Sequence, residues 1–290
     1  MKESRMFDRD WAPACGRIAE LRISGRYREA AAYGRDVLSD AEQAFGPNSA
    51  ELMPVLNQIG ILGKYSGDFV MAEDAYRRAL RIVQAGEAAG TEVASAVLLH
   101  NLAGLAHARG DVAEAERLAR AGIRSRTEGS SQLDPSALAA DRAALAAILI
   151  DAGNGTEAAE ILLRTIQDSE ASFGPDHYEV GIARHNLGSL YLRSGRLDDA
   201  MQELESALRI KELACGMTHP ELAITLHNLA KAYLASRRRD DGRACLKRAV
   251  QVLDGVVTAD HPTLVACRTA LFTSPKKTGE GSSTRGLADG

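Results

Sequence analysis

Aromatic residues are scarce in this chain of 290 residues, which is only 4% aromatic and has a single tryptophan. Strands favour aromatic and β-branched residues, so this scarcity argues against a sandwich or barrel built on aromatic strands. No apolar run reaches the eighteen residues that would predict a membrane span. The opening segment MKESRMFDRDW also lacks the apolar core of a secretory signal. These absences predict a soluble, cytoplasmic protein.

Charge of one sign is also lacking, since 35 Lys and Arg stand against 39 Asp and Glu, for a net charge of −4. Sequence-independent nucleic-acid binding comes from neutralising phosphates, so we expect no nucleic-acid partner. The four cysteines, Cys15, Cys215, Cys245 and Cys267, include no CxxC pair. A disulfide scaffold and a cysteine-ligated zinc site are therefore poorly supported, and we assign no metal.

Enzyme signatures are absent as well. The sequence has no GxGxxG after a strand, no GxxxxGK[ST], no HExxH and no GxSxG. The acidic pairs Asp198–Asp199 and Asp240–Asp241 stand at the starts of expected helices, where the helix dipole accounts for them. We therefore expect a protein that is not an enzyme and binds no cofactor.

What the sequence does contain is an internal repeat. Five glycines recur at intervals of 42 or 43 residues, each followed five residues later by an alanine and, eight residues after that, by an aliphatic side chain. Three positions that recur together over five or six units indicate tandem structural repeats. The glycines are Gly25, Gly67, Gly110, Gly153 and Gly195.

Each repeat unit reads as two helices. Ile182, Leu187 and Leu190 before Gly195, and Ala200 and Leu204 after it, recur at the three- and four-residue spacing of one helical face. A glycine enters left-handed backbone space without steric cost, so it suits the tight turn between the helices. Loops that contain Gly and Pro then lead to the next unit, and no strand pattern is present.

These columns resemble the tetratricopeptide repeat, in the 42-residue variety of kinesin light chains and many bacterial proteins, whose units carry HNLA in the first helix and HP before it. The resemblance implies an all-α, right-handed superhelical α-solenoid of about six helix-turn-helix repeats, whose first helices line a concave groove. We place an N-terminal extension at 1–11, a capping helix at 261–272 and a disordered tail at 273–290. The solenoid spans 12–272, with units at about 12–48, 49–90, 91–133, 134–175, 176–218 and 219–260.

Three departures from the pattern predict local consequences. The sixth unit has Arg237 at the turn-glycine position and Gly242 at the alanine position. A glycine inside a helix costs about 1 kcal/mol relative to alanine, so we expect this unit to be looser than its neighbours. Pro54 lies early in a first helix and should delay its start or kink it.

The resemblance implies that repeated asparagines in the groove hold the backbone of an extended peptide. A primary amide suits this task because it both donates and accepts hydrogen bonds. The same asparagines could instead bond to the neighbouring repeat and serve the architecture alone. The groove residues that we predict are Asn57, Gln58, Lys64, His100, Asn101, His107, His185, Asn186, Ser189, Arg193, His227, Asn228 and Lys231.

Two further features leave alternatives open. The alanines of the fourth unit could form an apolar pocket for one partner side chain or simply pack closely. The groove histidines could make binding depend on pH, whereas His185 and His227 alone could not complete a metal site across helices 8–10 Å apart. Three further histidines should lie in the loops at helix starts. The alanines are Ala140, Ala143, Ala144 and Ala147, and the loop histidines are His177, His219 and His261.

We therefore predict a non-catalytic adaptor or scaffold that binds an extended peptide or a partner protein in the groove. The alternative is a regulatory subunit whose superhelix changes shape when it binds a signal peptide or protein. A catalytic site hidden in the groove is a third hypothesis.

Overall fold

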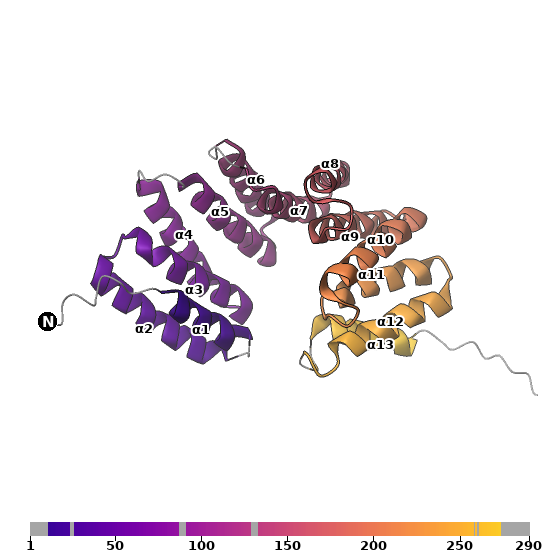
Figure 1. Cartoon of the computed structure of the whole chain (residues 1–290). Coiled ribbons are helices and arrows are strands. Elements are labelled where there is room, and N and C mark those ends of the chain that lie inside the picture. The colour runs from indigo at the N-terminus through magenta and orange to yellow at the C-terminus, as the bar shows by residue number, and fades with distance from the viewer. Residues whose placement is uncertain are drawn as a thin grey trace, which may run out of the picture. The chain divides into compact units, whose positions relative to one another are not determined.

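The computed structural model describes residues 11–23, 26–86, 91–128, 133–257, 259 and 261–273. Within these ranges the chain forms thirteen α-helices and one short 3₁₀ helix, and no strand (Figure 1). The prediction of an all-α repeat solenoid is thus confirmed. The tail that we expect to be disordered lies outside the described residues from 274 onward, as do residues 1–10 of the expected N-terminal extension.

The helices alternate as first and second members of successive repeat units, with α13 standing alone at the end. The first helices are α1 (Ala12–Ile23), α3 (Met53–Ser66), α5 (Thr91–Ala108), α7 (Pro135–Asp151), α9 (Tyr178–Arg193) and α11 (Leu222–Ala235), and α13 spans Pro262–Thr273. The second helices are α2 (Tyr27–Phe45), α4 (Phe69–Ala85), α6 (Val112–Glu128), α8 (Gly155–Phe173), α10 (Leu197–Cys215) and α12 (Arg239–Leu253).

The alanine column forms the innermost part of each helix pair. All five alanines are fully buried, with 0% exposure. A larger side chain at such a position would force the two helices apart, which explains why the residue type recurs. They are Ala30, Ala72, Ala115, Ala158 and Ala200.

The turn glycines adopt the left-handed conformation expected of them. Gly67, Gly110, Gly153 and Gly195 have φ between 73° and 84°, whereas Gly25 lies outside the described residues. In the sixth unit Arg237 adopts the same conformation, with φ of 62°. The turn still closes there, because the Arg238 N–H donates to the Tyr233 carbonyl at 2.8 Å, as the Arg196 N–H does to Tyr191 at 2.9 Å.

Small residues in the first helices allow close approach of the second helices. A Cβ added at Gly60 would lie 2.3 Å from the ring of Tyr76, and one at Gly188 would lie 2.7 Å from Cγ of Leu204. Gly242 reverses the arrangement, because its backbone on a second helix packs against Leu234 on the first. The looser packing expected of the sixth unit stays a prediction.

Pro54 delays the start of its helix, as expected. A 3₁₀ turn, η2 (Ala50–Leu52), leads into α3, and Pro54 occupies the first turn of that helix. The missing N–H of a proline costs nothing in the first turn, because that donor has no partner within the helix.

The chain divides into two compact parts, an N-terminal part (Met1–Asn186) and a C-terminal part (Leu187–Gly290). The core of the C-terminal part includes Leu226 of α11, Leu246 of α12 and both Leu264 and Cys267 of α13. The terminal helix therefore covers apolar surface of α11 and α12. Burial raises the pKa of Cys267 to about 11.

Two equivalent arginines hold the loops between repeat units. Arg78 on α4 donates to Glu42 at 2.5 Å and to the Pro47 carbonyl at 2.6 Å. Arg248 on α12 makes the same pair of contacts, with Glu212 and with the Met217 carbonyl at 2.9 Å. Each arginine thus ties the end of the preceding second helix to the loop that follows it.

Arg237 provides a test of the turn conformation. Arg237→Gly should stabilise the protein by about 1 kcal/mol, since a side chain at positive φ is sterically costly. Gly195→Ala should destabilise it by a similar amount for the same reason. Urea unfolding followed by circular dichroism measures both changes. A loss of stability in Arg237→Gly would show that contacts of the arginine outweigh the strain.

A second test concerns the approach of α3 to α4. A Cβ added at the buried Gly63 would lie 2.7 Å from the backbone N of Ala72 and 2.8 Å from the Asp68 carbonyl oxygen. Gly63→Ala should therefore destabilise the protein by about 1–3 kcal/mol. Gly16→Ala is the matched control, because that position is exposed with nothing within 4 Å, and it should stabilise α1 by about 0.5–1 kcal/mol. Equal effects on the urea midpoint would contradict the packing argument.

Candidate functional site

The first helices present a repeated set of side chains, which we call the first-helix face. Its amide row consists of Gln58, Asn101, Asn186 and Asn228, each nine residues before its turn and half-buried. One helical turn earlier lies its apolar row, thirteen residues before each turn. The apolar row consists of Pro54, Val97, Ala140, Ile182 and Ile224.

The asparagines connect adjacent first helices within each part of the chain. In the N-terminal part, the Asn101 amide on α5 donates to Oδ1 of Asn57 on α3 at 2.8 Å. In the C-terminal part, Asn228 on α11 donates to the Ser189 hydroxyl on α9 at 3.0 Å. These bonds support the architectural alternative for both asparagines. Each bond engages only one donor of a group that has two N–H and one carbonyl.

Two predicted groove histidines are paired with acids of the fourth unit. His100 Nδ1 lies 2.8 Å from Asp141 Oδ1, and the other oxygen of Asp141 accepts from Arg126 Nε at 2.6 Å. Asp141 and Arg126 are buried, so the ion pair links α6 and α7 away from water. His107 Nε2 similarly lies 2.7 Å from Asp151 Oδ2. These two histidines therefore tie α5 to α7.

Sequence reasoning missed Asp141 and Asp151. Both lie in the alanine-rich fourth unit, in which Ala143 and Ala144 stand at the positions of the His and Asn of other units. Asp141 stands two residues before Ala143, which is the position equivalent to the groove histidines, so the repeat pattern does not mark it. The signal that could have found it was a lone acid within the apolar segment of a predicted helix.

The remaining predicted groove residues differ in accessibility. Lys64, Arg193 and Lys231 are exposed, whereas His227 is half-buried and His185 is only 9% exposed. Lys64 reaches across to α5, where its Nζ would lie 2.9 Å from a Cβ added at Gly104. Desolvation lowers the pKa of Lys64. Desolvation, together with the charge of Lys231, also lowers the pKa of His227, which favours its neutral ring.

The apolar row contains the second feature that sequence reasoning missed. Val97 is 40% exposed on α5 and Ile224 is 48% exposed on α11, so these side chains face solvent beside the amide row. The 42- or 43-residue spacing of the apolar row is visible in the same frame as the glycines, but spacing alone does not show that the side chains are exposed. Exposed apolar residues at regular spacing offer surface that a partner can bury.

The alanines of the fourth unit lie in different environments. Ala143 is buried, Ala144 and Ala147 are half-buried, and Ala140 is exposed. A hollow between α7 and α8 is lined by residues that include Leu138, and none of the four alanines lines it. Close packing therefore describes Ala143 better than a pocket does.

The loop histidines act at helix starts, as expected. The ring nitrogens of His177 and His219 accept hydrogen bonds from the N–H groups of Glu179 and Glu221, both at 3.3 Å. His261 immediately precedes α13.

Acidic side chains with displaced pKa values are held in the charged form. Hydrogen bonds and charges of neighbouring arginines lower the pKa of Glu73 and of Glu114, which border a hollow among α4, α5 and α6. A general acid at neutral pH needs a raised pKa, so these two carboxylates are suited to ion pairing rather than to proton donation.

Comparisons with known proteins agree with this repeat architecture. Two sequence models described as "Tetratricopeptide repeat" match residues 136–213 and residues 20–51 and 95–129, which together make up half of the chain. No curated protein matches the sequence significantly. Within the described residues, none of the helices combines the length and apolar character needed to cross a membrane.

Three solved structures show the likeness in fold. BtubC (BKLC) from P. vanneervenii has a TM-score of 0.61 and 20% identity over 98% of this chain and 100% of its own. The nearly identical TPR-like repeats of a kinesin-light-chain-type protein from Podosopora anserina have a TM-score of 0.55 and 20% identity, over 70% of this chain and 95% of their own. A Rap protein complexed with Competence and Sporulation Factor has a TM-score of 0.57 and 14% identity, over 91% of this chain and 86% of its own.

The buried ion pair of Asp141 gives a testable contrast. Asp141→Ala should destabilise the protein by about 3–5 kcal/mol, because it leaves the Arg126 charge buried without its carboxylate. Asp168, whose side chain is 50% exposed and lies 2.6 Å from Arg142, is the matched control. Asp168→Ala should cost less than about 1 kcal/mol. Equal shifts of the urea midpoint would show that the Asp141 pair is solvated in solution.

Proposed function

Because the chain belongs to the tetratricopeptide-repeat family, we propose that it is a non-catalytic interaction module. It binds an extended segment of a partner protein on the first helices of either part. The observation that carries this proposal is the exposure of Val97 and Ile224, each one helical turn from an amide on the same helix.

The two rows suit different parts of an extended segment. Val97 and Ile224 offer apolar surface, and its burial contributes about 25 cal/mol per Å² before the costs of ordering the segment. Asn101 and Asn228 keep hydrogen-bonding capacity beyond the bonds to Asn57 and Ser189, and a peptide backbone can use it. The amides thus supply affinity with little sequence demand, while the apolar row selects side chains.

Positive charge on the first helices favours a partner segment that carries acidic residues. Lys64, Arg193 and Lys231 are exposed on first helices, and the chain as a whole carries a net charge of −4. A partner segment with apolar side chains and some acidic residues matches this combination. With no overall positive charge to neutralise phosphates, we propose no nucleic-acid partner, and we place the interaction in the cytoplasm.

A solved relative supports the class of function. The Rap protein with a TM-score of 0.57 was solved in complex with Competence and Sporulation Factor, so a protein of this fold can hold a partner molecule. At 14% identity that likeness concerns the fold alone, so it suggests no particular partner for this chain.

Substitutions in the apolar row test the proposal. Asparagine variants would be ambiguous, because Asn101→Ala also removes a bond to Asn57 that stabilises the fold by about 0.5–1.5 kcal/mol. A Val97→Asp/Ile224→Asp double variant should leave the fold intact, because both side chains are exposed. It should bind peptides selected from a random display library against the full-length protein at least about tenfold more weakly, equal to about 1.4 kcal/mol.

Exposed apolar residues on second helices provide the control. Val70 on α4 is 72% exposed and Leu213 on α10 is 64% exposed, so Val70→Asp/Leu213→Asp makes the same chemical change elsewhere. Fluorescence anisotropy should show peptide affinity within about twofold of wild type for this variant. Equal losses in both variants would contradict binding on the first-helix face. A large ligand-dependent change in radius of gyration would favour the regulatory alternative instead.

A further inference from the structure

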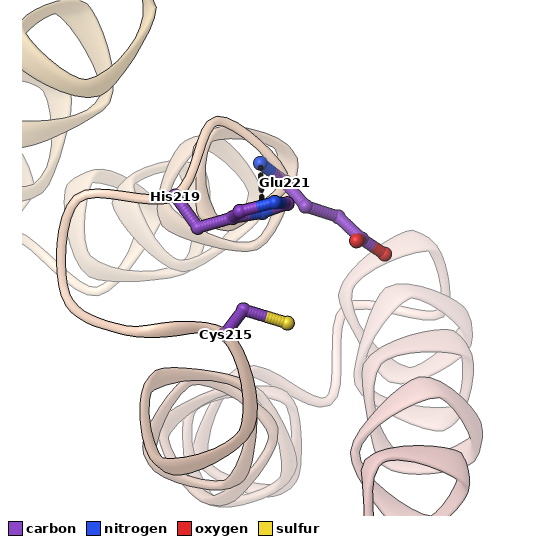
Figure 2. Close-up of side chains that lie close together, drawn as sticks. All are labelled: Cys215, His219 and Glu221. Carbon is purple, nitrogen blue, oxygen red and sulfur yellow. Dashed lines mark hydrogen bonds between the residues drawn. The ribbon is translucent and has the colours of Figure 1, made fainter.

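A thiol, an imidazole and a carboxylate come together where α10 ends and α11 begins (Figure 2). Ligand atoms of Cys215, His219 and Glu221 all lie within 4.8 Å of one another, and the three side chains extend towards the same side of the loop. Cys215 is half-buried, whereas His219 and Glu221 are exposed, so an ion can reach them from solvent.

We propose that Cys215, His219 and Glu221 form a binding site for a divalent transition metal of the zinc type. A thiolate with an imidazole selects zinc and its chemical neighbours over magnesium or calcium, which prefer oxygen ligands alone. Three protein ligands leave one position of a tetrahedral ion for water or for a ligand from another molecule. This proposal concerns the loop and does not depend on the function proposed for the first-helix face.

The loop backbone is held in place independently of any ion. Gly216 has φ of 88°, and its N–H donates to the Glu212 carbonyl at 2.9 Å. Arg248 on α12 donates to the Met217 carbonyl at 2.9 Å. These contacts fix the positions from which Cys215 and His219 project, so binding requires mainly side-chain adjustment.

The preceding repeat shows the same loop without a thiol. Residues 173–179, FGPDHYE, lie 42 positions before residues 215–221, CGMTHPE. Gly174 has φ of 90°, and the hydrogen bond from the Glu179 N–H to His177 has the same 3.3 Å length as its counterpart at His219. Phe173 stacks on the His177 ring with 4.3 Å between centroids, so the residue at this position faces the histidine.

The replacement of that phenylalanine by Cys215 therefore puts a metal ligand beside an imidazole. The loop at 45–51, FGPNSAE, has Ser49 at the histidine position, so of these three loops only 215–221 combines thiol, imidazole and carboxylate. The absence of CxxC pairs had argued against a cysteine-ligated metal. The informative pattern was instead Cys-x₃-His-x-Glu across the start of a helix.

One hydrogen bond within the loop competes with metal binding, and a charged side chain lies nearby. His219 Nδ1 accepts a hydrogen bond from the Glu221 N–H, and a metal on either ring nitrogen would displace it. At 3.3 Å this N–H···N hydrogen bond is long, so little is lost when it breaks. Lys211, one turn before Cys215, is buried; burial lowers its pKa, and charge on the Cys215 sulfur opposes that shift.

Cobalt(II) titration of the reduced, chelator-treated full-length protein tests the site. We expect a sulfur-to-cobalt charge-transfer absorption that saturates at one equivalent and disappears when zinc is added. Cys215→Ser should abolish the absorption. His219→Gln and Glu221→Gln should each weaken binding by more than about tenfold.

Two further variants keep this test decisive. Cys215→Phe installs the residue found at Phe173, so it removes the thiol from a loop that should stay folded, as circular dichroism would check. Cys245→Ala removes a half-buried thiol whose pKa burial raises to about 11, and it should retain the absorption. Val97→Asp should retain it too. No absorption in wild type, the same absorption in Cys215→Ser, or unchanged binding in both His219→Gln and Glu221→Gln would overturn the proposal.

Discussion

Close approach of two helix backbones is the constraint on which the rest of this structure depends. Two helices can pack this tightly only where one presents almost no side chain and the turn between them is short. The fully buried alanine column meets the first requirement, and the left-handed turn residue meets the second. The sixth unit shows how the two are coupled. Arg237 retains the turn at a steric cost, while Gly242 lets Leu234 pack against backbone where other units place an alanine.

The sequence predicted the fold because packing of this kind leaves a residue-type signature at every repeat. Ala200 and Gly195 can be read from their spacing, since few other residues fit those positions. The contacts of the candidate site were harder to predict from the sequence. Polar contacts between first helices depend on which way a side chain turns, and many residue types can make them. Asp141 lies two residues from the histidine position of the repeat, so spacing could not show that it bridges His100 and Arg126.

Contacts within the first-helix face distinguish architecture from recognition. Asn101, His100 and His107 are bonded to neighbouring first helices, and a substitution there changes the framework as well as the surface. Val97 and Ile224 are exposed, so they can vary with little cost to folding. Substitutions in the apolar row therefore change the exposed surface, while the polar bonds maintain the spacing between helices.

The loops between repeat units also combine a constant backbone with side chains that differ from one repeat to the next. Phe173 and Cys215 occupy equivalent positions on loops whose glycine conformations and histidine hydrogen bonds match, so their different side chains account for the chemical difference. Arg248 and Gly216 hold the backbone in place without using the Cys215 side chain. When the framework does not depend on a side chain, that side chain can change freely. At the proposed metal site, one substitution exchanges a stacking aromatic for a thiol, because the histidine already lies beside that position.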